Sequence, residues 1–273
     1  GQCRHCNDRA PGYCDNAPLF QVMAQRLDGS SPISQQGERI SGYFFAQSSF
    51  ASHAVASTRN MVKLPDNLPA ELMAPLACGV QTGMAAVMIA LDAKRGSALA
   101  VMGCGAVGLA AIMAAKIVEC ESIIAVDIKP DRLALARELG ATQCLDGNAS
   151  DLKRQLRKLG GMDYVIDTSG SSEVLTTGFD ALRARGTLLS LGVSAAGSKL
   201  PLDLGSLLIG GKTVRGSIEG DAVPKEFIPR MIDWFQQGLM PLDKLVKTYP
   251  FADINLAIRD AGSGTAIKPV VLM

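Results

Sequence analysis

The stretch that determines the fold runs from Ala98 to Asp127 and reads ALAVMGCGAVGLAAIMAAKIVECESIIAVD. A strand-like apolar run leads into Gly103-x-Gly105-x-x-Gly108, which opens a helix-like run, and a second strand-like run ends on Asp127. The acid follows the last glycine by 19 residues, which is the strand–turn–helix–strand context of a dinucleotide fingerprint. In such a turn the glycines let the backbone approach a pyrophosphate, which the positive helix end attracts.

The identity of the nucleotide depends on the side chains that follow the second strand. Asp127 is predicted to accept hydrogen bonds from the hydroxyls of the adenosine ribose. A carboxylate there would repel a ribose phosphate, so the sequence predicts NAD rather than NADP. Arg132 lies close by and has two interpretations: it contacts the nucleotide and softens this rejection, or it is a solvated helix residue.

Composition excludes several classes of protein. A length of 273 residues favours two domains, and a net charge of +1 with mixed signs gives no basic patch for nucleic acid. Seven cysteines without a secretory signal favour metal binding or buried thiols over a disulfide framework, and predict a cytoplasmic protein. Residues 96–115 carry no charge, but they contain the fingerprint glycines, so we interpret them as a buried strand and helix rather than a membrane span.

Strand-like and helix-like runs alternate from about Gly96 to Gly216, which predicts an α/β fold with a doubly wound parallel sheet. Strands are expected at 98–102, 122–126, 142–145, 164–167, 187–191 and 213–216. Helices are expected at 109–116, 130–139, 150–159 and 172–183. The remaining chain predicts a helix at 228–237, a strand at 246–249, a helix at 252–261 and a strand at 267–272.

Cysteine spacing near the N-terminus indicates a metal site. Cys3-x-x-Cys6 and Cys14 could supply three thiolates, whereas tetrahedral zinc takes four ligands. His5 could substitute for the fourth, although its neighbour Cys6 makes that geometry awkward; the alternative is a chance cluster.

Cys78 precedes Gly79-x-x-Thr82-Gly83 at the expected start of a helix, where the helix dipole would stabilise a metal-binding thiolate. Its alternative is a small buried apolar residue. Three further cysteines have no such context and are assigned to packing: Cys104, Cys120 and Cys144.

Taken together, these residues resemble the zinc-dependent medium-chain alcohol dehydrogenases over essentially the whole chain. Within that family the chain is most similar to aryl-alcohol (benzyl alcohol) dehydrogenases, through the segments 44–50, 75–83, 215–221 and 224–229. The resemblance implies a doubly wound Rossmann sheet flanked by the remainder of a GroES-like catalytic domain. It places a partial catalytic domain with a structural zinc lobe at 1–86, an NAD-binding domain at 87–222, and a segment returning to the catalytic domain at 223–273.

The resemblance also implies roles for individual residues. Cys3, Cys6 and Cys14 match three of the four structural zinc cysteines, and Cys78 matches one ligand of the catalytic zinc. Thr82 matches the residue beside the nicotinamide ring, and Val107 the side chain behind it. The other implied contacts are to the carboxamide and pocket from Leu191, Val193 and Glu219, to the pyrophosphate from Lys268, and to the substrate from Phe44 and Phe45.

The family pattern begins upstream of this sequence. Cys3, Cys6 and Cys14 match the second, third and fourth structural cysteines, so the first would fall one residue before Gly1, and the other two catalytic zinc ligands lie further upstream. Neither His5 nor His53 matches them. The expectation is therefore a fragment that binds NAD without appreciable turnover.

For the intact parent enzyme, the resemblance implies zinc-assisted, NAD-dependent oxidation of a primary, aromatic alcohol to an aldehyde. It also implies a homodimer or homotetramer paired near residues 213–218, with a small-molecule substrate and no nucleic acid or membrane partner. Two alternatives stay open: a zinc-free quinone-type reductase relative, and an inactive nucleotide-binding module.

Overall fold

The computed structural model describes residues 1–21, 23–47 and 49–273 and divides them into two compact units. The larger unit contains residues 75–222 and 227–245; the smaller contains residues 1–74, 223–226 and 246–273. The sequence placed the first domain boundary at residue 86, whereas the compact units part at residue 74. The physical reason is that α4 (Gly79–Ala85) packs along α5 (Ala106–Ile117) in the larger unit.

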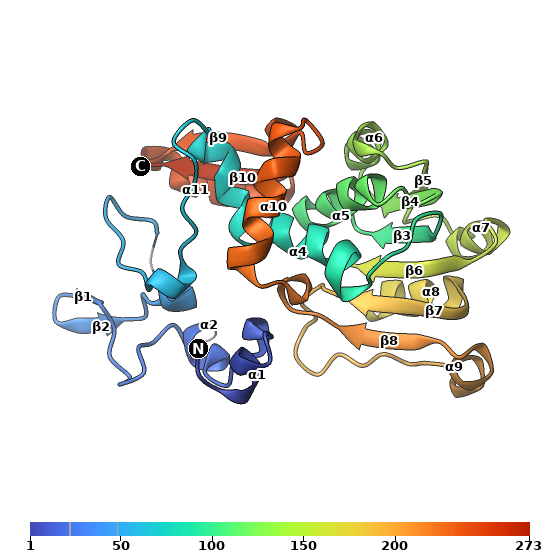
Figure 1. Cartoon of the computed structure of the whole chain (residues 1–273), viewed down its shortest axis with the longest axis horizontal. Helices are drawn as coiled ribbons and strands as arrows, with labels where there is room; N and C mark the ends of the chain where they lie inside the picture. The colour runs from blue at the N-terminus through green and yellow to red at the C-terminus, as the bar shows by residue number, and fades with distance from the viewer. Residues whose placement is uncertain (22, 48) are drawn as a thin grey trace. The chain divides into compact units, whose positions relative to one another are not determined.

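A six-stranded, wholly parallel sheet forms the centre of the larger unit (Figure 1). Its strands run in the order β5-β4-β3-β6-β7-β8. Their bounds are β3 (Ala98–Met102), β4 (Ser122–Asp127), β5 (Gln143–Asp146), β6 (Met162–Asp167), β7 (Leu182–Ser190) and β8 (Thr213–Gly216). The chain builds outward from β3 to β5 and then returns to place β6 on the other side of β3. The strand order therefore reverses between β3 and β6, where doubly wound sheets bind ligands. The predicted fold class is confirmed.

Helices cover both faces of this sheet. Right-handed crossovers place α5 and α6 (Pro130–Leu139) on one face and α8 (Ser172–Ala181) on the other, where it contacts α7 (Leu152–Lys158). Strand residues such as Leu99, Ile124 and Val165 are fully buried between the helical layers. This double burial explains why the strands are continuously apolar in sequence.

Several element boundaries differ from those expected. Helix α6 has the predicted bounds, with Pro130 in its first turn and Gly140 at φ +130° after its end. Helix α8 ends at Ala181, and β7 starts at Leu182, because the buried Leu182 already pairs with Met162 of β6. Helix α9 (Leu204–Gly210) was not expected; its N-cap, Asp203, accepts a hydrogen bond from the backbone N–H of Ser206.

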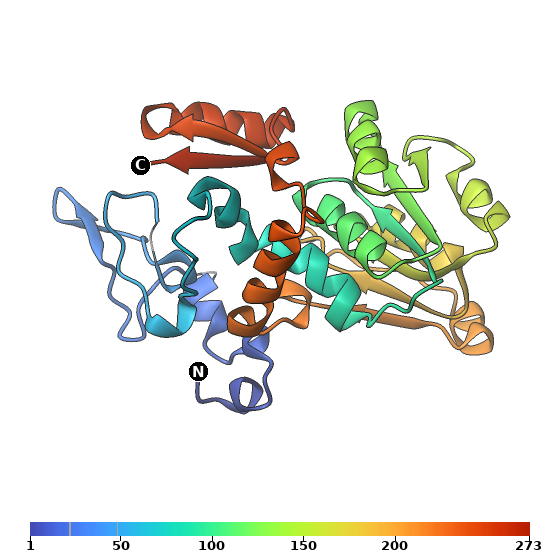
Figure 2. The same ribbon diagram turned by 45° about the horizontal axis from the view of Figure 1, so that its top comes forward.

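The smaller unit is built from short elements (Figure 2). Strands β9 (Val246–Pro250) and β10 (Lys268–Leu272) form a parallel pair against which α11 (Ile254–Ser263) packs. Strands β1 (Ile33–Gln35) and β2 (Glu38–Ile40) form a hairpin. The short helices are α1 (Arg4–Asn7), α2 (Ala17–Gln21) and α3 (Ala70–Met73), and α10 (Pro224–Gln236) begins in this unit and continues in the larger one.

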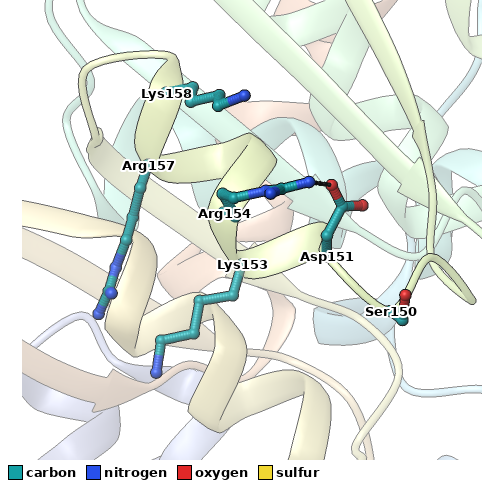
Figure 3. A pocket seen from close by; sticks show the side chains of 6 residues that line it. All are labelled: Ser150, Asp151, Lys153, Arg154, Arg157 and Lys158. Carbon is teal, nitrogen blue, oxygen red and sulfur yellow. Dashed lines mark hydrogen bonds and ion pairs between the residues drawn. The ribbon is translucent and has the colours of Figure 1, made fainter.

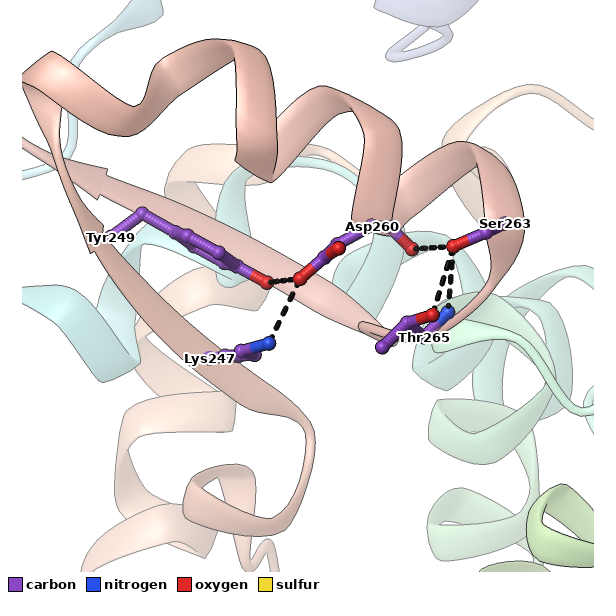
Figure 4. Close-up of polar contacts among 5 residues, drawn as sticks. All are labelled: Lys247, Tyr249, Asp260, Ser263 and Thr265. Carbon is purple, nitrogen blue, oxygen red and sulfur yellow. Dashed lines mark hydrogen bonds and ion pairs between the residues drawn. The ribbon is translucent and has the colours of Figure 1, made fainter.

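A polar network ties β9 to α11 (Figure 4). Lys247 Nζ and Tyr249 OH donate to the same Asp260 carboxylate oxygen, over 2.8 and 2.5 Å. These two hydrogen bonds lower the pKa of Asp260, and the carboxylate in turn raises the pKa of Lys247. Lys247, Tyr249 and Asp260 thus attach α11 to strand β9.

No single helix in the described part of the chain has the length and apolar character needed to cross a membrane. One bent pair, residues 70–77 with 79–90, passes on length and composition alone.

Candidate functional site

The fingerprint glycines form a tight turn between β3 and α5, at the carboxyl edge of the sheet. Gly103 has φ +99°, a conformation that side-chain-bearing residues rarely adopt. A methyl carbon on Gly108 would lie 1.9 Å from the carbonyl oxygen of Gly103, so helix and turn can approach this closely only without a side chain. By contrast, a methyl group on Gly105, the N-cap of α5, would meet nothing within 4 Å. Gly105 therefore faces open space at the helix N-terminus, as a pyrophosphate site requires.

Two side chains brace this turn through the backbone of Cys104. The Asp127 carboxylate, at the end of β4, accepts hydrogen bonds from the N–H groups of Cys104 (2.6 Å) and Lys129 (2.9 Å). Arg132 is buried and donates from Nη1 to the Cys104 carbonyl oxygen over 3.3 Å. Neither of the two interpretations given to Arg132 included this bond. Burial, followed by the Asp127 charge, raises the pKa of the Cys104 thiol, which makes it an inert packing group.

The strands on the other side of the switch point end in a second network, which the sequence did not single out. Asp167, fully buried at the end of β6, accepts hydrogen bonds from Ser169 Oγ (2.6 Å) and from two backbone N–H groups, those of Ser169 and Gly170. Thr168 Oγ1 donates toward the carbonyl oxygens of Met102 and Gly103. The sequence did contain a signal for this network: Asp167 is an acidic residue at the end of a buried strand that pairs with the fingerprint strand β3. The Asp167 carbonyl oxygen also accepts a hydrogen bond from the backbone N–H of Leu191, so this network holds the carboxyl end of β6 against the residue that follows β7. Val193, two residues further along the chain, is almost fully exposed.

Helix α4 brings a third group of residues to the larger unit's site. Cys78 is its N-cap and is exposed. The Thr82 hydroxyl lies 2.9 Å from the Cys78 carbonyl oxygen and 3.3 Å from Oε2 of Glu219. Gln81 Nε2 donates to the same Glu219 oxygen over 2.9 Å. Thr82 and Glu219, predicted from the family resemblance, are thus in contact, and Gln81 is the member that sequence reasoning missed.

Three thiols of the smaller unit converge. The sulfur atoms of Cys3, Cys6 and Cys14 all lie within 4.8 Å of one another, and Cys3 Sγ is 3.5 Å from Cys6 Sγ. Ligand sulfurs around a tetrahedral zinc ion at ~2.3 Å are separated by about 3.8 Å, so the three thiols fit such an ion. Backbone hydrogen bonds at Asp15 and Cys6 lower the pKa of the Cys3 thiol to about 7, whereas burial raises that of Cys6. His5 is outside the cluster; its Nε2 lies 3.8 Å from the Asp15 carboxylate.

The smaller unit also contains the aromatic and basic residues that the sequence assigned to binding. Phe44 and Phe45 are exposed and stack edge to face, with ring centroids 4.5 Å apart. Ser48 of the same quoted segment lies outside the described residues. Lys268 is half-buried at the start of β10.

A hollow along α7 is a different kind of surface (Figure 3). It is lined by Ser150, Asp151, Lys153, Arg154, Arg157 and Lys158. Two of these cations are already paired, Arg154 with Asp151 and Lys153 with Asp180. The hollow has the character of a charged, solvated helix face and contains none of the predicted site residues.

Known proteins share both the sequence and the fold of this chain. Residues 106–237 match the family model described as zinc-binding dehydrogenase. The chain is 39% identical to geraniol dehydrogenase from Castellaniella defragrans, over all of its own length and 74% of that protein. A probable alcohol dehydrogenase from a Pseudomonas species is 40% identical over 81% of this chain and 72% of the relative.

Solved structures agree. An alcohol dehydrogenase zinc-binding domain protein from Burkholderia ambifaria superposes with a TM-score of 0.96 at 43% identity, covering 100% of this chain and 75% of that one. Benzyl alcohol dehydrogenase from Acinetobacter calcoaceticus gives 0.93 at 38% identity, covering 99% and 74%. The glycine turn, the acid after β4 and these similarities lead to one conclusion: the chain belongs to the zinc-binding, medium-chain alcohol dehydrogenase family.

Proposed function

We propose that the intact parent enzyme of this chain catalyses the NAD-dependent oxidation of a primary, aromatic alcohol to an aldehyde by zinc-assisted hydride transfer. The observation that carries the proposal is the Gly103–Gly108 turn, closed against α5 and braced by the Asp127 carboxylate. The turn supplies a helix N-terminus for a pyrophosphate, and the carboxylate has lone pairs left for the ribose hydroxyls. Family membership supports alcohol dehydrogenation as the reaction.

In this proposal the larger unit binds and orients the cofactor. Val107, at the start of α5, contacts the back of the nicotinamide ring, and Thr82 lies beside it. Leu191, Val193 and the backbone at Glu219 hold the carboxamide and border the substrate. Arg132 acts indirectly by holding Cys104. The assignment of Lys268, a residue of the smaller unit, to the pyrophosphate rests on the family resemblance alone. Holding both reactants in one orientation and excluding water is the protein's contribution to hydride transfer.

The thiols are proposed as metal ligands. Cys3, Cys6 and Cys14 would hold a structural zinc ion, and the exposed Cys78 would provide one ligand of a catalytic ion. A catalytic zinc ion supplies Lewis acidity, which lowers the pKa of the alcohol. Seven free cysteines also suit a reducing compartment, so we propose a cytoplasmic location.

The proposed aromatic substrate rests on two observations. One relative in structure is named for benzyl alcohol, which is aromatic; geraniol, for which another relative is named, is not aromatic but is likewise a primary alcohol next to an unsaturated carbon. Phe44 and Phe45 present flat apolar side chains that suit an aromatic ring.

A chelator experiment tests the proposed reaction. NADH formation from benzyl alcohol, lost on zinc chelation and restored by zinc, is the supporting result. Turnover that survives chelation would instead indicate a zinc-free quinone-type reductase. The experiment is made on the intact parent enzyme, in which NAD binding without any turnover of the zinc-loaded protein would indicate the nucleotide-binding module.

Asp127→Ala is expected to weaken NAD binding by about tenfold to a hundredfold, because the variant loses the ribose hydrogen bonds and one brace of the Cys104 backbone. NADP binding should weaken much less, since the repulsion of its phosphate disappears. Calorimetric titration with both nucleotides measures this. Asp146→Asn, at the end of neighbouring strand β5, is the matched control and should preserve the NAD affinity. An unchanged NAD:NADP ratio in the Asp127 variant would contradict the assignment.

We also propose that the protein pairs through the edge of its sheet. Strand β8 is the last strand of the sheet, and α9 exposes Leu204, Leu208 and Ile209. Exposed apolar groups beside an open strand edge favour association. Ile209→Asp is expected to convert a dimer or tetramer to smaller species in sedimentation velocity. Val55→Asp is the control, since both side chains are 88% exposed. Equal sedimentation of the two variants would exclude this edge.

A further inference from the structure

A strained turn holds a carboxylate at the candidate nucleotide site. Glu219, Gly220 and Asp221 have φ values of +55°, +67° and +63°, so two residues with side chains adopt the left-handed region in succession around a glycine. A methyl carbon on Gly220 would lie 2.5 Å from Ala85 Cβ and 2.6 Å from the backbone nitrogen of Ala86. Backbone strain of this kind costs free energy and persists where surrounding contacts enforce it.

The two side chains of this turn are fixed in different ways. Asp221 is neutralised: Arg215 Nη2 pairs with its Oδ2 over 2.5 Å, and Ser217 donates to its Oδ1. Glu219 receives hydrogen bonds from two neutral donors, Gln81 and Thr82. Among the residues of the larger unit that the structure describes, no lysine, arginine or histidine forms an ion pair with Glu219.

Gln81 is unusual in how it holds that carboxylate. The side chain is fully buried, its amide nitrogen donates to Glu219, and its Oε1 has no hydrogen-bond partner among the described residues. Turning the amide over would direct its oxygen at the carboxylate, so the observed orientation is the favourable one. Leaving a buried carbonyl unsatisfied costs free energy. The buried amide therefore fixes the Glu219 carboxylate in one position, next to the Thr82 hydroxyl, at the cost of its own carbonyl group.

The position of Glu219 in the fold indicates which part of the cofactor its carboxylate would face. Asp127 marks the adenosine half of the edge at β4, so an extended dinucleotide crosses the switch point toward β6, β7 and β8. Glu219 follows β8 and is therefore in the nicotinamide half. The nicotinamide ring is positively charged when oxidised and neutral when reduced.

We propose that the Glu219 carboxylate, positioned by Gln81, makes the site discriminate between the two redox states of the cofactor in favour of the oxidised one. This inference rests on the proposed function. An unpaired carboxylate attracts the oxidised ring and has no such interaction with the reduced ring. NADH bound beside this carboxylate consequently becomes a stronger hydride donor than NADH bound without it. The reason is that loss of a hydride ion (one proton with two electrons) leaves the positively charged ring that Glu219 stabilises.

The test is the ratio of the two dissociation constants, Kd(NAD⁺)/Kd(NADH), measured by calorimetry and nucleotide fluorescence. Glu219→Gln keeps the shape of the side chain and removes its charge, and should raise the ratio about tenfold. Glu138→Gln removes the same charge from the far end of α6, where Glu138 pairs with Lys244, and should leave the ratio unchanged. Gln81→Met removes the amide that holds the carboxylate and should give an intermediate ratio.

Two outcomes overturn the inference. Parallel changes of both constants in Glu219→Gln would mean that the side chain only shapes the turn. If that variant does not fold, a wild-type ratio in Gln81→Met would likewise exclude positioning by Gln81. Failure of the proposed function is distinguishable, because it shows as absence of zinc-dependent turnover of benzyl alcohol in the chelator experiment, whereas this inference is read from the ratio of the two dissociation constants.

Discussion

Gly108→Ala is expected to abolish measurable NAD binding and to lower the free energy of unfolding by about 3 kcal/mol, the upper part of the range for overpacked sites. The added methyl carbon would lie 1.9 Å from the Gly103 carbonyl oxygen and 3.1 Å from Val101 Cγ1. The nearer neighbour is backbone of the turn after β3, which cannot move aside as a flexible side chain can, and the other is the side chain of Val101, which is fully buried in β3. The first turn of α5 must therefore separate from the sheet edge. Urea unfolding and NAD titration together measure the effect.

Gly105→Ala is the matched control because the same methyl group has open space there. Its backbone is extended, with φ −76° and ψ −170°, which alanine adopts freely. Stability should stay close to that of the unmodified protein, while NAD affinity falls, since the methyl group occupies the space where a pyrophosphate would approach. Two variants in one motif would thus separate packing from binding. Equal stability of the two variants would show that the contact at Gly108 relaxes at no cost.

Much of the larger unit could be predicted because its signals are local. A strand buried on both faces must be apolar along its length, and this identified β3 and β4 without reference to distant residues. Proline at the start of α6 and glycine after its end have fixed conformational meanings. The order of strands follows from the handedness of the crossovers.

Elements whose pattern of apolar residues does not match their secondary structure were missed or misplaced. Helix α9 exposes Leu204, Leu208 and Ile209 and packs only Leu207 against the core, so its apolar residues do not follow the usual helical periodicity. The start of β7 was missed because residues 183–185 are two arginines around an alanine, all exposed, which do not resemble a buried strand. Only the pairing of Leu182 with Met162 makes that segment part of the sheet.

The same distinction applies to the candidate site. The glycines and Asp127 lie within one 30-residue stretch, and their spacing alone suggested a nucleotide. The contact between Gln81 and Glu219 joins residues 138 positions apart, and Arg132 reaches Cys104 from the next helix. Neither contact can be predicted from local sequence, because each depends on how separate elements pack.

Cys14→Ser is expected to weaken zinc binding by about a thousandfold. Structural zinc sites bind with apparent free energies of about 10–16 kcal/mol, so one thiolate among so few ligands contributes several kcal/mol. Cys3 and Cys6 are fixed by α1, whereas Cys14 is returned to them by the turn at residues 11–13. Without the third sulfur the ion would have only the two thiolates of one tight turn. Zinc per chain, and competition with a chromophoric chelator, measure the loss.

Cys120→Ser is the matched control, since Cys120 is buried beside Ser97 in the larger unit and far in sequence from the cluster. Its zinc content should equal that of the unmodified protein. An equal zinc affinity in Cys14→Ser would mean that the three converging thiols are not a metal site. Metal and nucleotide should also be separable: the thiols belong to residues 3–14 of the smaller unit, and the glycine turn to the larger. Cys14→Ser should therefore bind NAD with unchanged affinity while residues 1–21 become more susceptible to protease, because ordering of this short, loop-rich segment depends on the ion rather than on a core.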